Sequence, residues 1–298
     1  MQIFYELNHK HNLAIALGYF DGVHIGHRAV IESAVNFARK NNTKSAVITF
    51  SDHPYCYFKG VCPKYILTRK EREKRIASLG IDYLYELNFE DFALLTAQEY
   101  LNNILINYFH PISISTGWNH NFGKNKSGNV DFLEVEAKTY NYKYFKISPQ
   151  KVNKEIISSK EIISSTEIRK LLNKGEIEKA NLMLGQNFSI EGEIVKGNQI
   201  GRTIGFRTAN LVYPPELIEL PYGVYAVETT YGKGIANFGI RPTINGSNTV
   251  LEVHILNFEK DIYGKRINVA FNKMIRIEKK FPSLDALKNQ INLDIKSI

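Results

Sequence analysis

The sequence predicts an α/β domain built on a parallel sheet, followed by an antiparallel β-barrel or sandwich and a C-terminal helix. Three observations predict this order. Short apolar runs alternate with helical segments through the first half of the 298 residues. After Gly185 the apolar residues alternate along longer runs with few helical segments between them. Ser283 then stands where it can cap a last amphipathic segment.

The first half contains strands separated by helices, which form parallel sheets through right-handed crossovers. Thr68 with Glu71, and Thr96 with Glu99, have the spacing of helix capping boxes, and Gly80 is placed to end a helix. Ligands bind such sheets at the carboxyl ends of the strands. The predicted strands are 13–17, 45–50, 83–87, 112–116 and 144–147, and the predicted helices are 29–40, 68–80 and 97–108.

The second half begins after a pair of helices that Gly175 and Gly185 end. A turn at 231–234 predicts a hairpin between two strands. We place the boundary near 185–188, which gives one domain over 1–185 and another over 186–298. The predicted helices are 166–173, 177–184 and 284–291, and the predicted strands are 189–195, 224–229, 250–256 and 266–277.

Composition and charge restrict the class of protein. The chain is 44% hydrophobic, and no apolar run approaches the roughly 20 residues that a bilayer span requires. The N-terminus lacks the pattern of a secretory signal, so we expect a cytoplasmic location and no membrane partner. Cys56 and Cys62 are close enough to bridge, but we expect reduced thiols there.

The net charge of +8 has two interpretations, a surface for nucleic acid or a nucleotide enzyme with scattered lysines. In the segment 69–75 the basic residues alternate with acidic ones, which favours a solvated helix face. We therefore do not expect nucleic acid as a partner. Small molecules are the expected partners, and the sequence leaves the oligomeric state open.

The most informative segment is Gly18–Arg28, GYFDGVHIGHR. It follows an apolar strand and precedes a helix, so it places His24 and His27 at a helix N-terminus, where N–H groups and the helix dipole attract anions. Gly22 and Gly26 let the backbone approach a nucleotide closely. Two surface histidines beside a turn are the alternative interpretation, but the pairing and the glycines favour phosphate chemistry.

A second segment, ISSTEIR at 163–169, combines hydroxyls at a helix start with Arg169 one turn later. Serines at such positions are usually helix caps. Hydroxyls, backbone N–H groups and a guanidinium together are, however, suited to phosphate oxygens.

A third segment, the glycine-rich 197–210, can fold around phosphates. It ends in Thr208 and Asn210, whose oxygens suit Mg²⁺. Glu252 follows on an alternating strand. A lone glutamate there usually faces solvent, but beside such a loop it is a candidate general base for a hydroxyl nucleophile.

These motifs, in this order, resemble the prokaryotic bifunctional riboflavin kinase/FMN adenylyltransferase (FAD synthetase) family over essentially the whole chain. The resemblance implies a Rossmann-like nucleotidyltransferase domain followed by a riboflavin-kinase-type barrel. It implies transfer of AMP from ATP to FMN, giving FAD and pyrophosphate with magnesium, and a module for phosphorylating riboflavin.

The resemblance also assigns roles residue by residue. His24, His27, Arg169 and Glu252 are the implied catalytic residues, and Thr208 and Asn210 the implied metal ligands. Phe50, His53, Asn119 and Phe122 are implied flavin-binding residues. The implied nucleotide-binding residues are Gly18, Phe20, Asp21, Gly22, Gly26, Ser164, Ser165, Thr166, Gly201, Gly205, Thr208 and Asn210.

The chain departs from the family pattern at four positions. Tyr19 stands where Asn is common, Asp52 where Pro is common and Asn119 where the family has Asp. Arg207 replaces the proline of a Pro-Thr-Ala-Asn motif, which removes a backbone restraint and adds a charge near the metal site.

Three functions therefore remain open. The leading hypothesis is an FAD synthetase whose riboflavin kinase activity is in doubt because of Arg207. The alternatives are a fully bifunctional enzyme, in which Arg207 faces solvent, and a flavin-binding regulator that contacts RNA. Intact His24, His27 and Glu252 argue against the regulator. A transferase that shares only the histidine motif and uses another acceptor is disfavoured by the second half of the chain.

Overall fold

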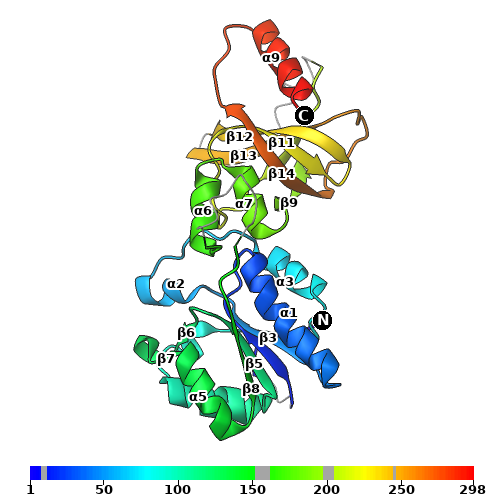
Figure 1. The fold of residues 1–298 in the computed structure, drawn as a ribbon. Helices are drawn as coiled ribbons and strands as arrows, with labels where there is room; N and C mark the ends of the chain where they lie inside the picture. Colours follow the sequence, from blue (N-terminus) through cyan, green and yellow to red (C-terminus); the bar gives the residue numbers. More distant parts are fainter. Residues whose placement is uncertain (8–11, 152–161, 197–204, 244–245) are drawn as a thin grey trace. The chain divides into compact units, whose positions relative to one another are not determined.

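A computed structural model describes residues 1–7, 12–151, 162–196, 205–243 and 246–298 (Figure 1). It divides into two compact units. The first comprises Met1–Pro63 and the described residues between Arg69 and Ser164; the second comprises Lys64–Thr68 and the described residues of Ser165–Ile298. The predicted functional boundary near residue 185 stays a prediction. Among the described residues, none of the helices combines the length and apolar character needed to cross a bilayer.

The first unit is built on a six-stranded sheet in which every neighbouring pair is parallel. Its five predicted strands are confirmed, and one short strand joins them at the edge. In spatial order the strands are β1 (Gln2–Phe4), β4 (Tyr83–Leu87), β3 (Ser45–Phe50), β2 (Ala14–Leu17), β5 (Ser113–Gly117) and β8 (Lys143–Ile147).

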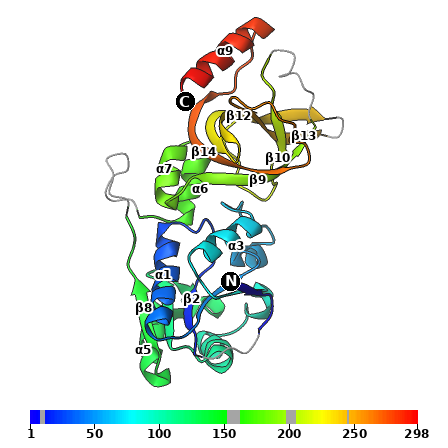
Figure 2. The same ribbon diagram turned by 90° about the vertical axis from the view of Figure 1, so that its right-hand side faces the viewer.

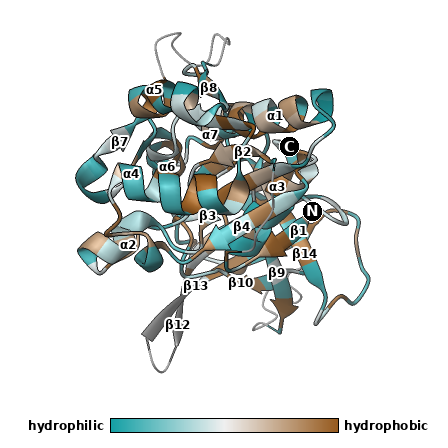
Figure 3. Cartoon of the chain, turned by 90° about the horizontal axis from the view of Figure 1, so that it is seen from below, coloured by the Kyte–Doolittle hydropathy of each residue, from teal (hydrophilic) through white to brown (hydrophobic). Residues whose placement is uncertain are grey.

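Helices cover both faces of this sheet because the central strands are apolar on both sides. Helix α1 (Ile25–Lys40) buries Val30, Ile31 and Ala34 and packs against β2, β3 and β5. On the other face, Leu13 and Ile15 share a core with η2 (Tyr100–Phe109) and α5 (Val130–Tyr140). Hydrophobic residues gather on strands such as β3 (Figure 3).

The helix predicted over 97–108 is divided in the structure. The capping box of Thr96 and Glu99 is confirmed and opens the short α4 (Ala97–Glu99). The chain then continues in the π-helical η2. Helix α5 was not predicted from the sequence. The remaining short elements are η1 (Phe89–Asp91), β6 (Asn121–Phe122), η3 (Lys124–Lys126) and β7 (Gly128–Asn129).

Helix α3 (Arg69–Ser78) corrects one prediction. Its alternating charges were expected to face solvent, but Arg72 and Arg75 are only 4% and 6% exposed. The reason lies on β4, where the fully buried carboxylate of Glu86 pairs with Arg72 and, at 2.6 Å, with Arg69. A buried carboxylate requires such partners.

The second unit contains a closed antiparallel barrel, which decides between the barrel and sandwich expected from the sequence (Figure 2). The barrel closes where β9 pairs with β10. In order around the barrel its strands are β10 (Ala209–Val212), β13 (Gly246–Ile255), β12 (Gly232–Thr243), β11 (Gly223–Thr229), β14 (Arg266–Ile277) and β9 (Phe188–Val195).

Helices hold to this barrel through specific polar contacts. α6 (Ser165–Asn173) packs on α7 (Ile177–Leu184), and Asn181 of α7 binds the backbone of Phe271 and Phe188 at 2.8 and 2.7 Å. Ser283 caps α9 (Leu284–Lys296), as predicted. A bidentate ion pair between Arg276 and the buried Asp294 fastens α9 to β14.

Candidate active sites

The strand order places two loops at one edge of the sheet. From β2 the chain builds outward through β3 and β4, and then crosses back to place β5 on the other side of β2. Ala14 and Ala16 pair in parallel with Ser113 and Ser115. The turns that follow β2 and β5 therefore leave neighbouring carboxyl ends, at the reversal of strand order where α/β sheets bind ligands.

The turn after β2 has an unusual backbone. Phe20 and Val23 have positive φ angles of 60° and 43°, which residues with a side chain rarely adopt, and Gly22 has φ 84°. Such backbone conformations concentrate at functional sites. A Cβ atom at position 26 would lie 3.2 Å from the His24 ring. Glycine at this position therefore leaves room for the ring.

The two predicted histidines are brought together. His24 is the N-cap of α1, and its Nδ1 accepts a hydrogen bond from the His27 backbone N–H at 3.2 Å. The rings stack with centroids 3.5 Å apart, and the ring of Phe20 meets His27 edge-on at 5.3 Å. Helix α1 therefore starts earlier than predicted, at Ile25 rather than Ala29.

The environment of His24 fixes its protonation. Burial lowers the pKa of His24 to about 4, so the ring is neutral at pH 7. Because Nδ1 accepts a hydrogen bond, the single ring proton resides on Nε2. His24 can therefore donate a hydrogen bond to a phosphate oxygen without carrying a charge of its own.

Arg72 supports this turn, a role that sequence reasoning missed. Its guanidinium donates to the carbonyls of Tyr19 at 3.4 Å and Phe50 at 3.0 Å, and it lies over the Tyr19 ring. Thr49 also donates to the Tyr19 carbonyl, at 3.0 Å. The signal was Glu86 in an otherwise apolar strand, because a buried carboxylate implies a cationic partner.

The four implied flavin-binding residues lie in different surroundings. Phe50 contacts Phe89, and His53 meets the Tyr19 ring edge-on at 4.7 Å. Asn119 is exposed in the turn after β5. Phe122 packs against Tyr100, Phe132 and His120.

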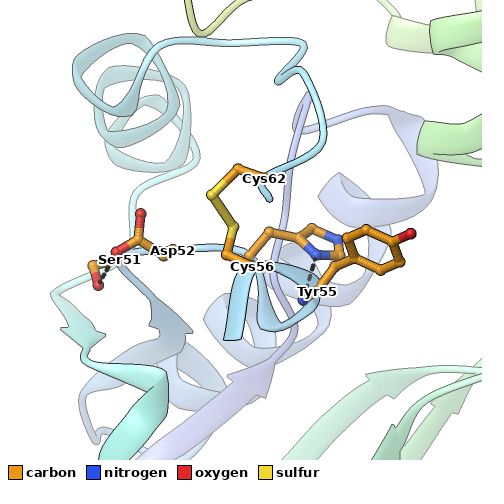
Figure 4. Close-up of a disulfide and its surroundings, with 6 residues drawn as sticks. Ser51, Asp52, Tyr55, Cys56 and Cys62 are labelled. Atoms are coloured by element: carbon orange, nitrogen blue, oxygen red, sulfur yellow. Dashed lines mark hydrogen bonds between the residues drawn. A yellow bond between two sulfur atoms is a disulfide. The ribbon is translucent and has the colours of Figure 1, made fainter. Parts of the chain in front are cut away.

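The segment after His53 corrects a second prediction. His53 caps helix α2 (Pro54–Lys59), and its Nδ1 accepts from the Tyr55 N–H at 3.0 Å. Cys56 and Cys62 were expected as reduced thiols, but the structure joins them in a disulfide (Figure 4). The helix and the left-handed Gly60 that ends it turn the chain back, so the two Cα atoms come within 4.4 Å.

The ISSTEIR segment spans the division between the two units. Ser164 ends the described part of the first unit, and Ser165 and Thr166 open α6 in the second. Arg169, one turn into α6, donates from Nε to the carbonyl of Lys64 at 2.9 Å. The catalytic role of Arg169 and the nucleotide contacts of the hydroxyls stay predictions.

The barrel carries a cavity of about 190 Å³ beside the third motif. Arg207 and Thr208 line it on one side and residues 258–263 on the other. Asn210 on β10 is the cross-strand partner of Glu252 on β13, so their side chains share one face. The cavity is lined instead by the adjacent pair Ala209 and Val253, and neither Asn210 nor Glu252 lines it. Gly201 lies outside the described residues, whereas Gly205 is described, with φ 91°.

Arg207 is exposed to solvent, and it also lines the cavity. Its Nη1 donates to the carbonyl of Glu259 at 3.0 Å, and its own carbonyl is 2.8 Å from Nδ1 of His254. The side chain thus connects the start of β10 to the loop on the other side of the cavity.

Comparisons with known proteins match both halves. The FAD synthetase family matches residues 6–161, and the riboflavin kinase family matches residues 184–298. The bifunctional riboflavin kinase/FMN adenylyltransferase of Escherichia coli K12 is 36% identical over 94% of this chain and 90% of its own length. The protein of the same name from Buchnera aphidicola subsp. Acyrthosiphon pisum is 35% identical over 95% and 91%.

A solved structure from Streptococcus pneumoniae, described as a macrolide-efflux protein, has a TM-score of 0.87 and 31% identity over 99% of this chain and 98% of that one. The fold, the order of the motifs and the relatives agree. The chain therefore belongs to the family of bifunctional riboflavin kinase/FMN adenylyltransferases.

Proposed function

We propose that the first unit transfers AMP from ATP to FMN. The observation that carries this proposal is the stacked pair of histidines at the start of α1, beside the reversal of strand order. A phosphate oxygen of FMN attacks the α-phosphorus of ATP, the bond from that phosphorus to the β-phosphate oxygen breaks, and FAD and pyrophosphate result. Negative charge builds on the α-phosphate oxygens and on the leaving pyrophosphate.

The residues of the turn are suited to stabilising this charge. The first N–H groups of a helix lack partners within it, and Ile25 and Gly26 supply those of α1. The neutral His24 donates from Nε2, and His27 stacks on it and lies over the same helix start. Donors fixed before the reaction need no reorganisation in the transition state. Arg72 holds the turn in shape by binding the Tyr19 carbonyl.

We further propose that the barrel phosphorylates riboflavin, so that the protein is bifunctional. Glu252 accepts the proton of the attacking flavin hydroxyl while the γ-phosphoryl group of ATP is transferred. The contact of Arg207 with the Glu259 carbonyl favours this second function. The guanidinium, whose charge was expected to disturb the metal site, is held by that carbonyl.

Magnesium fits the barrel residues. Thr208 lines the cavity, and Asn210 shares a face of the sheet with Glu252, so Thr208 and Asn210 supply hard oxygen donors from neighbouring positions of one segment. Thr208 and Asn210 would hold the ion, which would neutralise charge on the ATP phosphates when bound. We also propose a cytoplasmic location, where both nucleotides are available.

Two substitutions and two substrates test these functions separately. Wild-type protein receives ATP and Mg²⁺ with FMN in one tube and riboflavin in another, and chromatography resolves the flavins. We expect FAD from both tubes. His27→Ala should accumulate FMN from riboflavin without FAD, and Glu252→Gln should make FAD only from FMN. Failure of wild-type protein to make FAD from FMN would overturn the first function, and failure to make FMN from riboflavin would overturn the second.

A further inference from the structure

The disulfide closes a small loop, residues 56–62, on the surface of the first unit. Cys56 is half-buried in α2 and Cys62 is exposed. Between them Gly60 turns the chain with φ 68°, and a side chain there would meet nothing within 4 Å. This disulfide loop is thus open to solvent, and a reagent can reach Cys62 directly. These are the only two cysteines among the 298 residues, so thiol chemistry on this chain reports on this pair alone.

The disulfide loop carries exposed aromatic side chains. Phe58 is 61% exposed and Tyr57 43%, although both contact Phe89 with ring centroids 5.7 and 5.9 Å apart. Phe89 in turn contacts Phe50, an implied flavin-binding residue, at 5.0 Å. We call Phe50, Tyr57, Phe58 and Phe89 the aromatic cluster. The colouring of α2 in Figure 3 shows hydrophobic residues within this short helix. Such rings suit a flat aromatic ligand.

The disulfide loop is also connected to the turn that holds the two histidines. His53 begins α2, and its imidazole meets the Tyr19 ring at 4.7 Å. Tyr19 directly precedes Phe20, whose ring contacts His27. A change in the conformation of α2 therefore acts on the aromatic cluster and on the turn that holds the histidines.

We propose that Cys56 and Cys62 form a thiol–disulfide switch that controls the affinity of the first unit for FMN. In the oxidised form the closed disulfide loop restricts Tyr57 and Phe58 to conformations that receive the isoalloxazine group of FMN. Reduction releases these residues, so binding FMN must then order them. The proposal rests on the proposed function insofar as FMN is the ligand. Disulfides in reducing compartments are commonly redox-sensing, which agrees with a cytoplasmic location.

The chemistry is a thiol–disulfide exchange with a dithiol. A thiolate of the dithiol attacks the sulfur of Cys62, the more exposed of the two residues, and forms a mixed disulfide, and Cys56 leaves as a thiolate that takes up a proton. The second thiol of the reagent then displaces Cys62 and becomes the oxidised cyclic disulfide. Two electrons and two protons pass to the protein. A disulfide of the same class reverses the reaction.

The first arm of the test needs no enzyme activity. Protein purified in air is denatured and its thiols are titrated before and after treatment with dithiothreitol. We expect about zero and then about two thiols per chain. Limited proteolysis should cleave 57–61 faster in the reduced protein, because that segment is then released. Two free thiols in air-purified protein would overturn the proposal.

The second arm measures FMN affinity by quenching of flavin fluorescence, and the KM for FMN in FAD formation. The dithiol is removed under anoxic gas before FMN is added, so it cannot reduce the flavin. We expect reduction to raise the Kd and the KM for FMN about tenfold, with a smaller fall in kcat because α2 also contacts the turn that holds the histidines. Cys56→Ser/Cys62→Ser should match the reduced protein and ignore the reagent. Phosphorylation of riboflavin by the barrel is the internal control and should not respond.

Equal FMN affinities for the oxidised and reduced protein would overturn the switch while leaving the proposed function intact. If instead FMN binding responds to reduction but neither form makes FAD, the switch stands and the proposed function fails. An effect of dithiothreitol that persists in Cys56→Ser/Cys62→Ser would also overturn the switch, because it would arise elsewhere.

Discussion

His24 and His27 lie three residues apart, and their rings stack with an angle of 17° between planes. The His24 ring accepts the N–H of His27, so the same bond that caps α1 sets the tautomer of His24. The helix cap and the proposed catalytic role of His24 thus depend on the same hydrogen bond. The tight turn that precedes it, with Phe20 and Val23 at positive φ, is the structural requirement for placing both rings over the helix start.

Replacing His27 by alanine should lower the rate of FAD formation from FMN about 100-fold, as expected for loss of one preorganised donor. The His27 N–H that caps α1 with His24 is retained in this variant, so the thermal unfolding curve should move little. His110→Asn is the control, because asparagine tolerates its left-handed φ of 40° and the site lies at a helix end away from the motif. A variant that keeps the wild-type rate would remove His27 from the mechanism.

Stability should fall as the pH drops below about 6.5, the ordinary pKa of histidine. Burial lowers the pKa of both His24 and His120 to about 4 in the folded chain. Between about pH 6.5 and 4 the unfolded chain therefore holds more protons, and each histidine costs up to about 1.4 kcal/mol per pH unit. Above that window neither group contributes a pH dependence. Urea unfolding from pH 7.5 to 5 measures the slope.

His120→Phe separates the two histidines. The His120 Nε2 is buried and has no hydrogen-bond partner among the described residues, and the ring stacks on Phe122. Phenylalanine keeps the stack and removes the unsatisfied atom, so the free energy of unfolding at pH 7.5 should rise by about 1 kcal/mol. The slope of the unfolding free energy against pH between about 6.5 and 4 should fall by the contribution of one proton. An unchanged slope would show that His120 titrates normally.

Arg72→Met should destabilise the first unit by about 3 kcal/mol or more, because it leaves Glu86 with one cation fewer in a buried site. FAD formation should fall as well, since the Tyr19 and Phe50 carbonyls lose their donor. Lys70→Met, on the exposed side of the same helix, is the control. Chemical unfolding monitored by fluorescence gives both free energies. Equal values for the two variants would contradict the role of Arg72.

The sequence predicted the sheet strands, several antiparallel strands of the second unit and the position of the histidine motif, because these depend on local periodicity and on turn residues. Ser45–Phe50 and Arg266–Ile277 were predicted to the residue. It failed where long-range contacts decide. Arg72 looked solvated until β4 brought Glu86 beneath it, and the two cysteines could be called bonded only once α2 and Gly60 had turned the chain.

The relation of the motifs to each other was also only partly predictable. The neighbouring ends of β2 and β5 follow from the order of strands and helices, so those loops could be placed together. The contact of Arg207 could not, because it depends on the conformation of a loop more than 50 residues away in the sequence, as the 52-residue separation from Glu259 shows.

Arg207→Ala should raise the KM for riboflavin phosphorylation about fivefold, the effect of one hydrogen bond of about 1 kcal/mol. The Arg207 carbonyl, which pairs with His254, is unaffected, so the loss isolates the contact with Glu259. Arg207→Lys should recover part of it, and Arg207→Pro should match or exceed wild type because proline fixes φ directly. FAD formation from FMN serves as the internal control. If Arg207→Ala phosphorylates riboflavin as well as wild type, the side chain does not position the cavity loop.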